Sequence, residues 1–153
     1  MLPLRNKETY MDTVTAIFAR VSSLRYPTAE EYETRVRNDV NNRLFRLDPK
    51  IIVAKADAAV STSKPIIADI NAVNATFSNL TDRNREYIIQ AVKAVYFPYK
   101  GKALIPNKVI ASRVLAFATS NYCTPLTAYR WLKEARALCA YYRGLTIEEP
   151  DVI

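Results

Sequence analysis

Histidine is absent from this 153-residue chain, and glycine occurs only twice. The chain therefore lacks the commonest general base, the commonest metal ligand and the usual pH-sensitive side chain. Two glycines, Gly101 and Gly144, cannot build a glycine-rich phosphate loop. Carboxylates such as Asp69 and Glu134 are scattered among helix-type segments. We therefore expect no enzyme, no catalytic residues, no cofactor and no small-molecule substrate.

Cysteine is as scarce as glycine. Cys123 and Cys139 have no metal-ligand spacing, which predicts two small buried hydrophobic side chains and no metal site. No apolar run reaches the roughly 18 to 20 residues that cross a membrane, and the first residues lack the hydrophobic region of a secretory signal. Half of the residues are hydrophobic, so the chain can form a core and need not be disordered.

Positive charge is in excess and is unevenly distributed. The formal net charge is +7. Residues 83 to 143 contain eleven basic side chains and only two acidic ones, whereas the first sixty residues contain ten basic and eight acidic ones. Such a distribution favours a polyanionic partner, with simple solubility as the alternative interpretation.

Hydrophobic residues recur at helical spacing along nearly the whole chain. One apolar stripe consists of Tyr10, Val14, Ile17, Val21 and Leu24. Similar stripes follow, one on a helix that opens at Thr28 and others in the second half of the chain. No strand ladder and no internal repeat is evident. The sequence therefore predicts an all-α protein with six or seven helices.

Helix ends are marked by capping residues. Thr28 forms a capping box with Glu31, three residues later. Asp48, Thr81 and Thr124 are further predicted N-caps. A left-handed residue at Gly144 would end the last helix.

The chain is expected to divide near residues 61 to 65, where serine, threonine and proline predict a linker. Residues 1 to 60 then form a nearly neutral helical N-terminal arm, and residues 66 to 145 form a basic helical body. Residues 96 to 102 are expected to be a loop. The acidic residues 146 to 153 are expected to be a tail outside the body.

The stretch from residue 118 to 136 is similar to a helix-turn-helix, the DNA-reading motif in which a second helix enters the major groove. Thr124 is a natural N-cap, Pro125 suits the first helical position, and Ala118 supplies the small residue of the first helix. Tyr122 opposes the motif, because a bulky residue stands where the turn needs positive φ, unless Asn121 takes that position. On this interpretation the DNA-contacting residues are Thr127, Arg130, Lys133 and Arg136.

A second pattern lies between residues 66 and 135. The positions that carry it are Ala72, Val73, Thr76, Phe77, Thr81, Asn84, Arg85, Tyr87 and Lys93, and it continues through residues 112 to 121 and a Thr-Pro helix start. In these positions the chain resembles a different family, the major coat proteins of rod-shaped and filamentous archaeal viruses of the rudivirus and lipothrixvirus type. It departs from that family in the glycine-poor loop after Phe97.

The resemblance implies a helical N-terminal arm followed by a four-helix bundle. It also implies a virion coat protein, assembled in the host cytoplasm, that pairs with itself or a paralogous coat protein. Such dimers wrap linear double-stranded DNA, held in A-form, inside a helical filament. The corresponding chemistry is phosphate neutralisation without sequence reading.

We expect the phosphate contacts to come first from basic residues of the arm and then from two arginines near the bundle entrance. A solvated helix face, or pairing with Glu31, Glu33 or Asp39, is the alternative role of each. The expected nucleic-acid-binding residues are Arg20, Arg25, Arg35, Arg37, Arg43, Arg46, Lys50, Lys55, Lys64, Arg83 and Arg85. A helix-turn-helix regulator or replication accessory protein is the alternative function, and a protein-only helical scaffold is a third.

Overall fold

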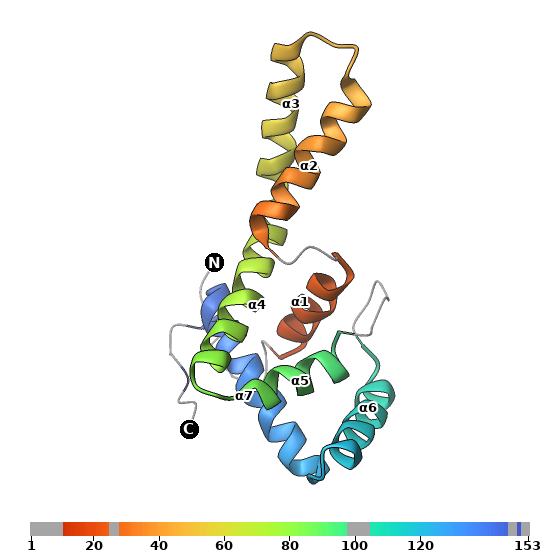
Figure 1. The fold of residues 1–153 in the computed structure, drawn as a ribbon, viewed down its shortest axis with the longest axis vertical. Coiled ribbons are helices and arrows are strands. Elements are labelled where there is room, and N and C mark those ends of the chain that lie inside the picture. The colour runs from red at the N-terminus through yellow and green to blue at the C-terminus, as the bar shows by residue number, and fades with distance from the viewer. Residues whose placement is uncertain (1–10, 25–27, 98–104, 147–149, 151–153) are drawn as a thin grey trace.

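The computed structural model describes residues 11–24, 28–97, 105–146 and 150 of the chain. Within these ranges the protein is all-α and contains no strand, as the sequence predicts (Figure 1). The helices are α1 (Met11–Leu24), α2 (Ala29–Leu44), α3 (Pro49–Thr62), α4 (Lys64–Asp82), α5 (Glu86–Val95), α6 (Asn107–Ser120) and α7 (Pro125–Arg143).

The helices form a body and a projection. Helices α2 and α3 run side by side in opposite directions as a hairpin that extends away from the other five helices (Figure 1). Helix α4 follows α3 almost directly and carries the chain into the body. The pair α2–α3 is called the hairpin below.

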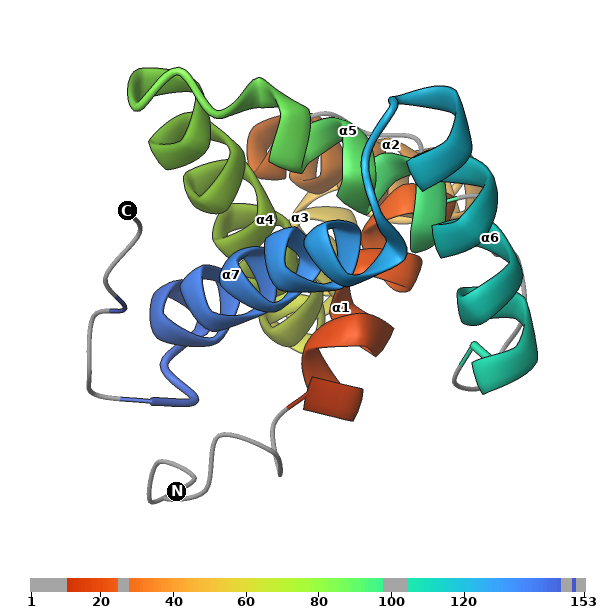
Figure 2. The same cartoon turned by 90° about the horizontal axis from the view of Figure 1, so that it is seen from below.

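Helix α7 is the central element of the body and contacts α1, α4, α5 and α6 (Figure 2). Its Leu132 and Leu138 are fully buried, as are Phe18 of α1, Val73 of α4 and Ile88 of α5, which all belong to one hydrophobic cluster. Burying these side chains is the main stabilising contribution to such a fold. The body therefore holds the hydrophobic core.

Helix α1 belongs to the body, which corrects the expected arm. Its Val14, Ile17 and Phe18 lie in the core cluster, and the Phe18 ring stacks on Tyr96 with 5.7 Å between ring centroids. The apolar stripe that the sequence predicts on α1 thus packs against α4 and α7. Within the described residues, the projecting part is limited to the hairpin.

The predicted linker at residues 61 to 65 is also wrong, because only Ser63 separates α3 from α4. The Ser63 hydroxyl donates to the Ala59 carbonyl oxygen at 2.9 Å. Pro65 lies in the first turn of α4, where no intrahelical N–H is needed. A composition typical of linkers therefore forms a helix-to-helix junction here.

Three predicted N-caps are confirmed and one is wrong. The side chains of Thr28, Asp48 and Thr124 accept hydrogen bonds from backbone N–H groups of the following helices at 3.1, 2.8 and 3.2 Å. Thr81, by contrast, lies inside α4, and α5 begins only at Glu86. The turn between these two helices is made by Asn84 at φ 58°, a conformation that asparagine tolerates better than most residues.

The end of the last helix is also confirmed, since Gly144 has φ 81° and follows Arg143. The predicted loop at residues 96 to 102 and the predicted acidic tail lie largely outside the described residues. The same holds for Tyr10, the first residue of the predicted apolar stripe.

Candidate nucleic-acid interface

Several of the basic residues expected to contact phosphate are held by carboxylates. Arg20 donates to Asp69 at 3.0 Å, and Arg85 donates to Glu134 at 2.9 Å. Arg20 joins α1 to α4, and Arg85 joins the α4–α5 turn to α7. These two arginines hold elements of the body together. A phosphate group could bind them only by displacing Asp69 or Glu134.

The two arginines in the middle of α2 are also paired. Arg35 lies 3.6 Å from Asp39 on the same helix. Arg37 donates to Asp57 of α3 at 2.7 Å, so it joins the two helices of the hairpin, and this bond is the main cause of its raised pKa. The alternative role foreseen for them, as partners of acidic neighbours, is what the structure shows.

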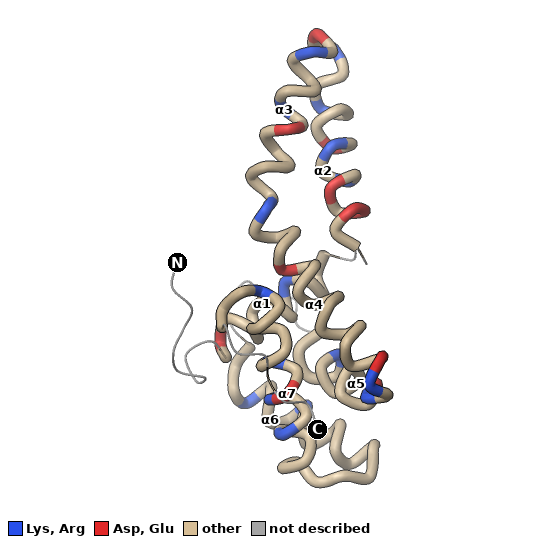
Figure 3. Tube along the Cα trace, turned by 90° about the vertical axis from the view of Figure 1, so that its left-hand side faces the viewer, with Lys and Arg blue, Asp and Glu red and all other residues tan. Residues whose placement is uncertain are grey.

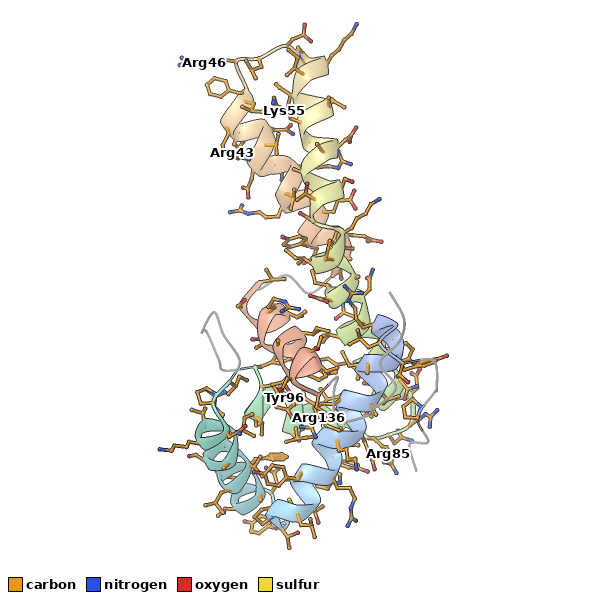
Figure 4. All side chains as sticks on the ribbon, turned by 180° about the vertical axis from the view of Figure 1, so that it is seen from behind. Arg43, Arg46, Lys55, Arg85, Tyr96 and Arg136 are labelled. Carbon is orange, nitrogen blue, oxygen red and sulfur yellow. The ribbon has the colours of Figure 1, made fainter. Side chains whose placement is uncertain are left out.

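The basic residues at the far end of the hairpin have a different environment. In the described part of the chain, none of these four side chains has a carboxylate partner within ion-pair distance. Arg43, Arg46 and Lys55 lie on the half of the hairpin that is further from the body, with Arg46 at its end (Figure 4). We call this set the basic tip, and it consists of Arg43, Arg46, Lys50 and Lys55.

An exposed aromatic ring lies next to the basic tip. The Arg46 guanidinium lies over the Phe45 ring, 5.3 Å from its centroid, and 67% of the Phe45 surface is exposed. A guanidinium attracted to an aromatic ring still has N–H donors that can reach a phosphate. The sequence pattern did not single out Phe45, although a phenylalanine between Arg43 and Arg46, close to a predicted helix end, was a usable signal.

Charge is divided along the length of the hairpin. The basic tip lies around one acidic residue, Asp48, at the far end. Closer to the body, five acidic residues outnumber Arg35 and Arg37, and Figure 3 shows the resulting change of sign along α2. The five are Glu30, Glu31, Glu33, Asp39 and Asp57.

The other expected residues do not join this set. Lys64 is exposed at the start of α4, near the body end of the hairpin. Arg83 is exposed in the α4–α5 turn. Arg25 lies outside the described residues.

The helix-turn-helix candidate is a sharp corner between α6 and α7. The Cys123 N–H donates to the Ala118 carbonyl oxygen at 3.1 Å, and Tyr122 has φ 55°. Tyr122 therefore occupies the left-handed position, whereas Asn121 has φ −111°. A fully exposed tyrosine, with 99% of its surface accessible, takes the conformation that the motif usually gives to glycine.

The four contact residues of this alternative do not act together. Arg130 and Lys133 are exposed on α7, but Arg136 turns into the body and donates to the Tyr96 hydroxyl at 2.7 Å (Figure 4). Burial raises the pKa of the Tyr96 phenol, and the Arg136 charge partly offsets this effect. Thr127 is used locally, since its hydroxyl lies 3.0 Å from that of the Thr124 cap. Arg136 is thus a structural residue.

The described residues contain no group of three or more histidine, cysteine, aspartate or glutamate side chains that could hold a metal ion. No helix among them is long and apolar enough to span a membrane. No protein-family model, no curated protein and no solved structure matches this chain.

Proposed function

We propose that the protein is a structural coat protein that binds linear double-stranded DNA through phosphate contacts without reading its sequence. The hairpin acts as the DNA-binding arm, and helices α4 to α7 act as the four-helix bundle of the body. In this proposal the protein has no catalytic activity, and its partners are duplex DNA and further copies of itself or of a paralogous coat protein in a virion.

One observation carries the DNA-binding part of the proposal. The basic tip presents four cationic side chains without carboxylate partners in the described residues, at the end of a projecting helical hairpin. Unpaired lysine and arginine release condensed counterions when they meet phosphates, which is the main source of sequence-independent affinity. A projecting hairpin can reach into a groove or along a DNA backbone from a distance.

The coat-protein part is supported by the resemblance in residues 66 to 135 and by the all-α architecture. A coat protein contacts a phosphate backbone of any sequence, so it needs cations and hydrogen-bond donors and no pattern of base-edge contacts. The basic tip has this chemistry, because arginine and lysine donate but do not accept hydrogen bonds.

The DNA-binding test replaces the basic tip with alanine in a single variant carrying Arg43→Ala, Arg46→Ala, Lys50→Ala and Lys55→Ala. Affinity for a random-sequence duplex is measured between about 50 and 200 mM salt. Each phosphate contact contributes roughly 0.9 to the slope of log affinity against log salt, so we expect the slope to fall by about 3 to 4.

A matched control removes four positive charges elsewhere, through Lys93→Ala, Lys108→Ala, Arg130→Ala and Lys133→Ala. Both variants lower the net charge equally, so a purely long-range effect would weaken binding to the same extent in both. The proposal expects the control to keep most of the slope. If the control loses the slope and the tip variant keeps it, DNA binds at the body instead.

The coat-protein part has its own test, which is electron microscopy of the protein with random-sequence linear duplex DNA. Filaments with a constant subunit repeat are expected. Discrete complexes that form only on particular sequences, and that lose this preference in Arg130→Ala, would instead support the helix-turn-helix regulator. That alternative is favoured by the two exposed cations of α7, Arg130 and Lys133.

A further inference from the structure

The far end of the hairpin exposes apolar side chains among its cations. Phe45 and Leu47 lie in the turn between α2 and α3, and Ile51 lies in the first turn of α3. Phe45 is the most exposed of the three, at 67% against 42% for Leu47 and 47% for Ile51. Because so little of the Phe45 ring is buried, it contributes little to the stability of the fold. The ring is available to another molecule.

The turn that presents this ring is held by hydrogen bonds at both of its ends. The Leu47 N–H donates to the Leu44 carbonyl oxygen at 2.9 Å. The Asp48 side chain accepts from the Lys50 N–H at 2.8 Å and so caps α3. A side chain on a fixed turn loses less conformational freedom on binding than one on a loose loop. Phe45 is thus presented by a preorganised turn.

The charges of the hairpin favour an approach of DNA to its end. The basic tip lies around Phe45, and the Arg46 guanidinium is 5.3 Å from the ring centroid. The five acidic residues described above lie closer to the body and repel phosphates along the length of the hairpin. Two adjacent helices are also about 20 Å wide, whereas the major and minor grooves of DNA are about 12 and 6 Å wide. Side chains of the turn can therefore enter a groove where the whole hairpin cannot.

We propose that Phe45 enters the minor groove of bound duplex DNA and inserts between two neighbouring base pairs, which bends the duplex. This inference rests on the proposed function, since it assigns how the basic tip engages DNA. Phenylalanine is among the apolar wedges that proteins insert in this way, together with lysine and arginine contacts. Arg43 and Arg46 flank Phe45 in the chain and supply such contacts. The inserted ring makes no hydrogen bonds to base edges, so phosphate binding without sequence reading is retained.

Insertion and bending are coupled physically. A base step opened by a side chain loses stacking between its two base pairs, and the aromatic ring replaces part of that contact. The duplex then kinks toward its major groove, which allows it to contact more of the protein surface. Each bound copy would therefore change the shape of the duplex in addition to neutralising its charge.

An anionic bilayer is the competing partner for an apolar ring among cations. A helix that lies in a membrane surface has a continuous apolar face. Helix α3 lacks such a face, because its exposed Ile51 and Val53 are two positions apart and lie about 200° apart around the helix. The exposed apolar surface of the turn is centred on one ring, which fits a base step better than a bilayer.

The test measures the bend of a random-sequence duplex of about 30 base pairs, which is nearly straight alone because it is much shorter than the persistence length of DNA. Energy transfer between dyes at its two ends reports the bend. The native chain should bend the duplex by at least about 20°. Phe45→Ala should abolish the bend and weaken binding about tenfold, and Phe45→Leu, which keeps an apolar wedge, should retain part of both. Neither variant removes a charge, so the slope of log affinity against log salt should be unchanged.

Tyr122→Ala is the matched control. It removes a fully exposed ring from the α6–α7 corner without changing the charge of the protein. The bend and the affinity should both be unchanged in this variant. Helix content from circular dichroism verifies that each variant is folded.

Four results would overturn the inference. A duplex that binds with the full salt slope but stays straight would exclude the wedge and leave the proposed function intact. A bend that persists in Phe45→Ala and disappears in Tyr122→Ala would assign the wedge to the α6–α7 corner. Vesicles of phosphatidylcholine and phosphatidylserine that bind the native chain but not Phe45→Ala, with the duplex left straight, would assign the ring to a lipid surface. Absence of any duplex binding would contradict the proposed function, and the wedge with it.

Discussion

Tyr122 is held in a conformation that few side chains adopt. Its φ is 55°, and its ring makes almost no contact with the rest of the chain. Left-handed backbone costs a non-glycine residue roughly 1 to 2 kcal/mol. The fixed geometry of the α6–α7 corner supplies this energy, since the Cys123 N–H is bonded to Ala118.

Replacing Tyr122 with glycine should therefore stabilise the protein. Relief of the strain outweighs the additional backbone entropy of glycine in the unfolded chain, which costs roughly 0.5 to 1 kcal/mol. We expect the free energy of unfolding to rise by about 0.5 to 1 kcal/mol. Denaturant unfolding measures the change. The control Asn121→Gly should destabilise, since Asn121 has negative φ and donates from Nδ2 to the Phe117 carbonyl oxygen.

The buried Cys139 thiol should make the stability of the protein depend on pH. Burial raises the pKa of the Cys139 thiol from 9.0 to about 12. Because the folded pKa exceeds the unfolded one, the stabilisation is complete below pH 9 and is lost as pH rises from 9 to 12. Cys139→Ala should flatten the fall in unfolding free energy over this window. An undiminished fall in Cys139→Ala would contradict this assignment.

At the scale of helices, Asp69 is a shared partner that ties three elements together. Arg20 of α1 and Arg143 of α7 each donate to one of its carboxylate oxygens, at 3.0 and 2.8 Å. Asp69 itself lies on α4 and is 4% exposed. A carboxylate with two arginines on its two oxygens fixes the relative positions of these helices.

Asp69→Asn should therefore destabilise the body. The substitution removes the charge that both arginines need, and breaking a buried pair typically costs 3 to 5 kcal/mol. Because Arg20 is half exposed, water screens part of the effect, and we expect a loss of about 2 to 3 kcal/mol. Thermal unfolding would show it as a lower Tm. Asp57→Asn, which removes an exposed pair with Arg37, should change Tm much less.

Helix starts could be predicted where a single side chain caps the free backbone N–H groups of the first turn. Thr28, Asp48 and Thr124 each accept a hydrogen bond from an N–H two or three residues ahead, so local sequence contains the whole motif. Thr81 has the same side chain but lies inside α4, because the α4–α5 turn is closed by the Arg85 N–H on the Leu80 carbonyl oxygen. The turn, and not the Thr81 side chain, therefore decides where α4 ends and α5 begins.

At the scale of the whole molecule, stability is unevenly distributed. The hairpin buries two residues, whereas α5, with only ten residues, buries Ile88, Ile89, Ala91, Val92 and Val95. Local opening is easiest where few apolar contacts oppose it. The hairpin is therefore expected to be the least stable of the described parts of the protein.

Hydrogen exchange should report this difference. Backbone amides of α2 and α3 should exchange at least about tenfold faster than those of α5 and α7. Equal protection of α3 and α5 would contradict the expectation.

The sequence by itself determined the helical class and several helix ends, because periodicity and capping act within one or two turns of chain. It also indicated the arm residues among which the basic tip lies. Only the tertiary structure decided which cations are available. Arg20 and Arg85 are paired with carboxylates 49 residues away in the chain, and Arg136 with a tyrosine 40 residues away. Such partners are set by packing of the body, which brings distant segments together, and no local pattern encodes them.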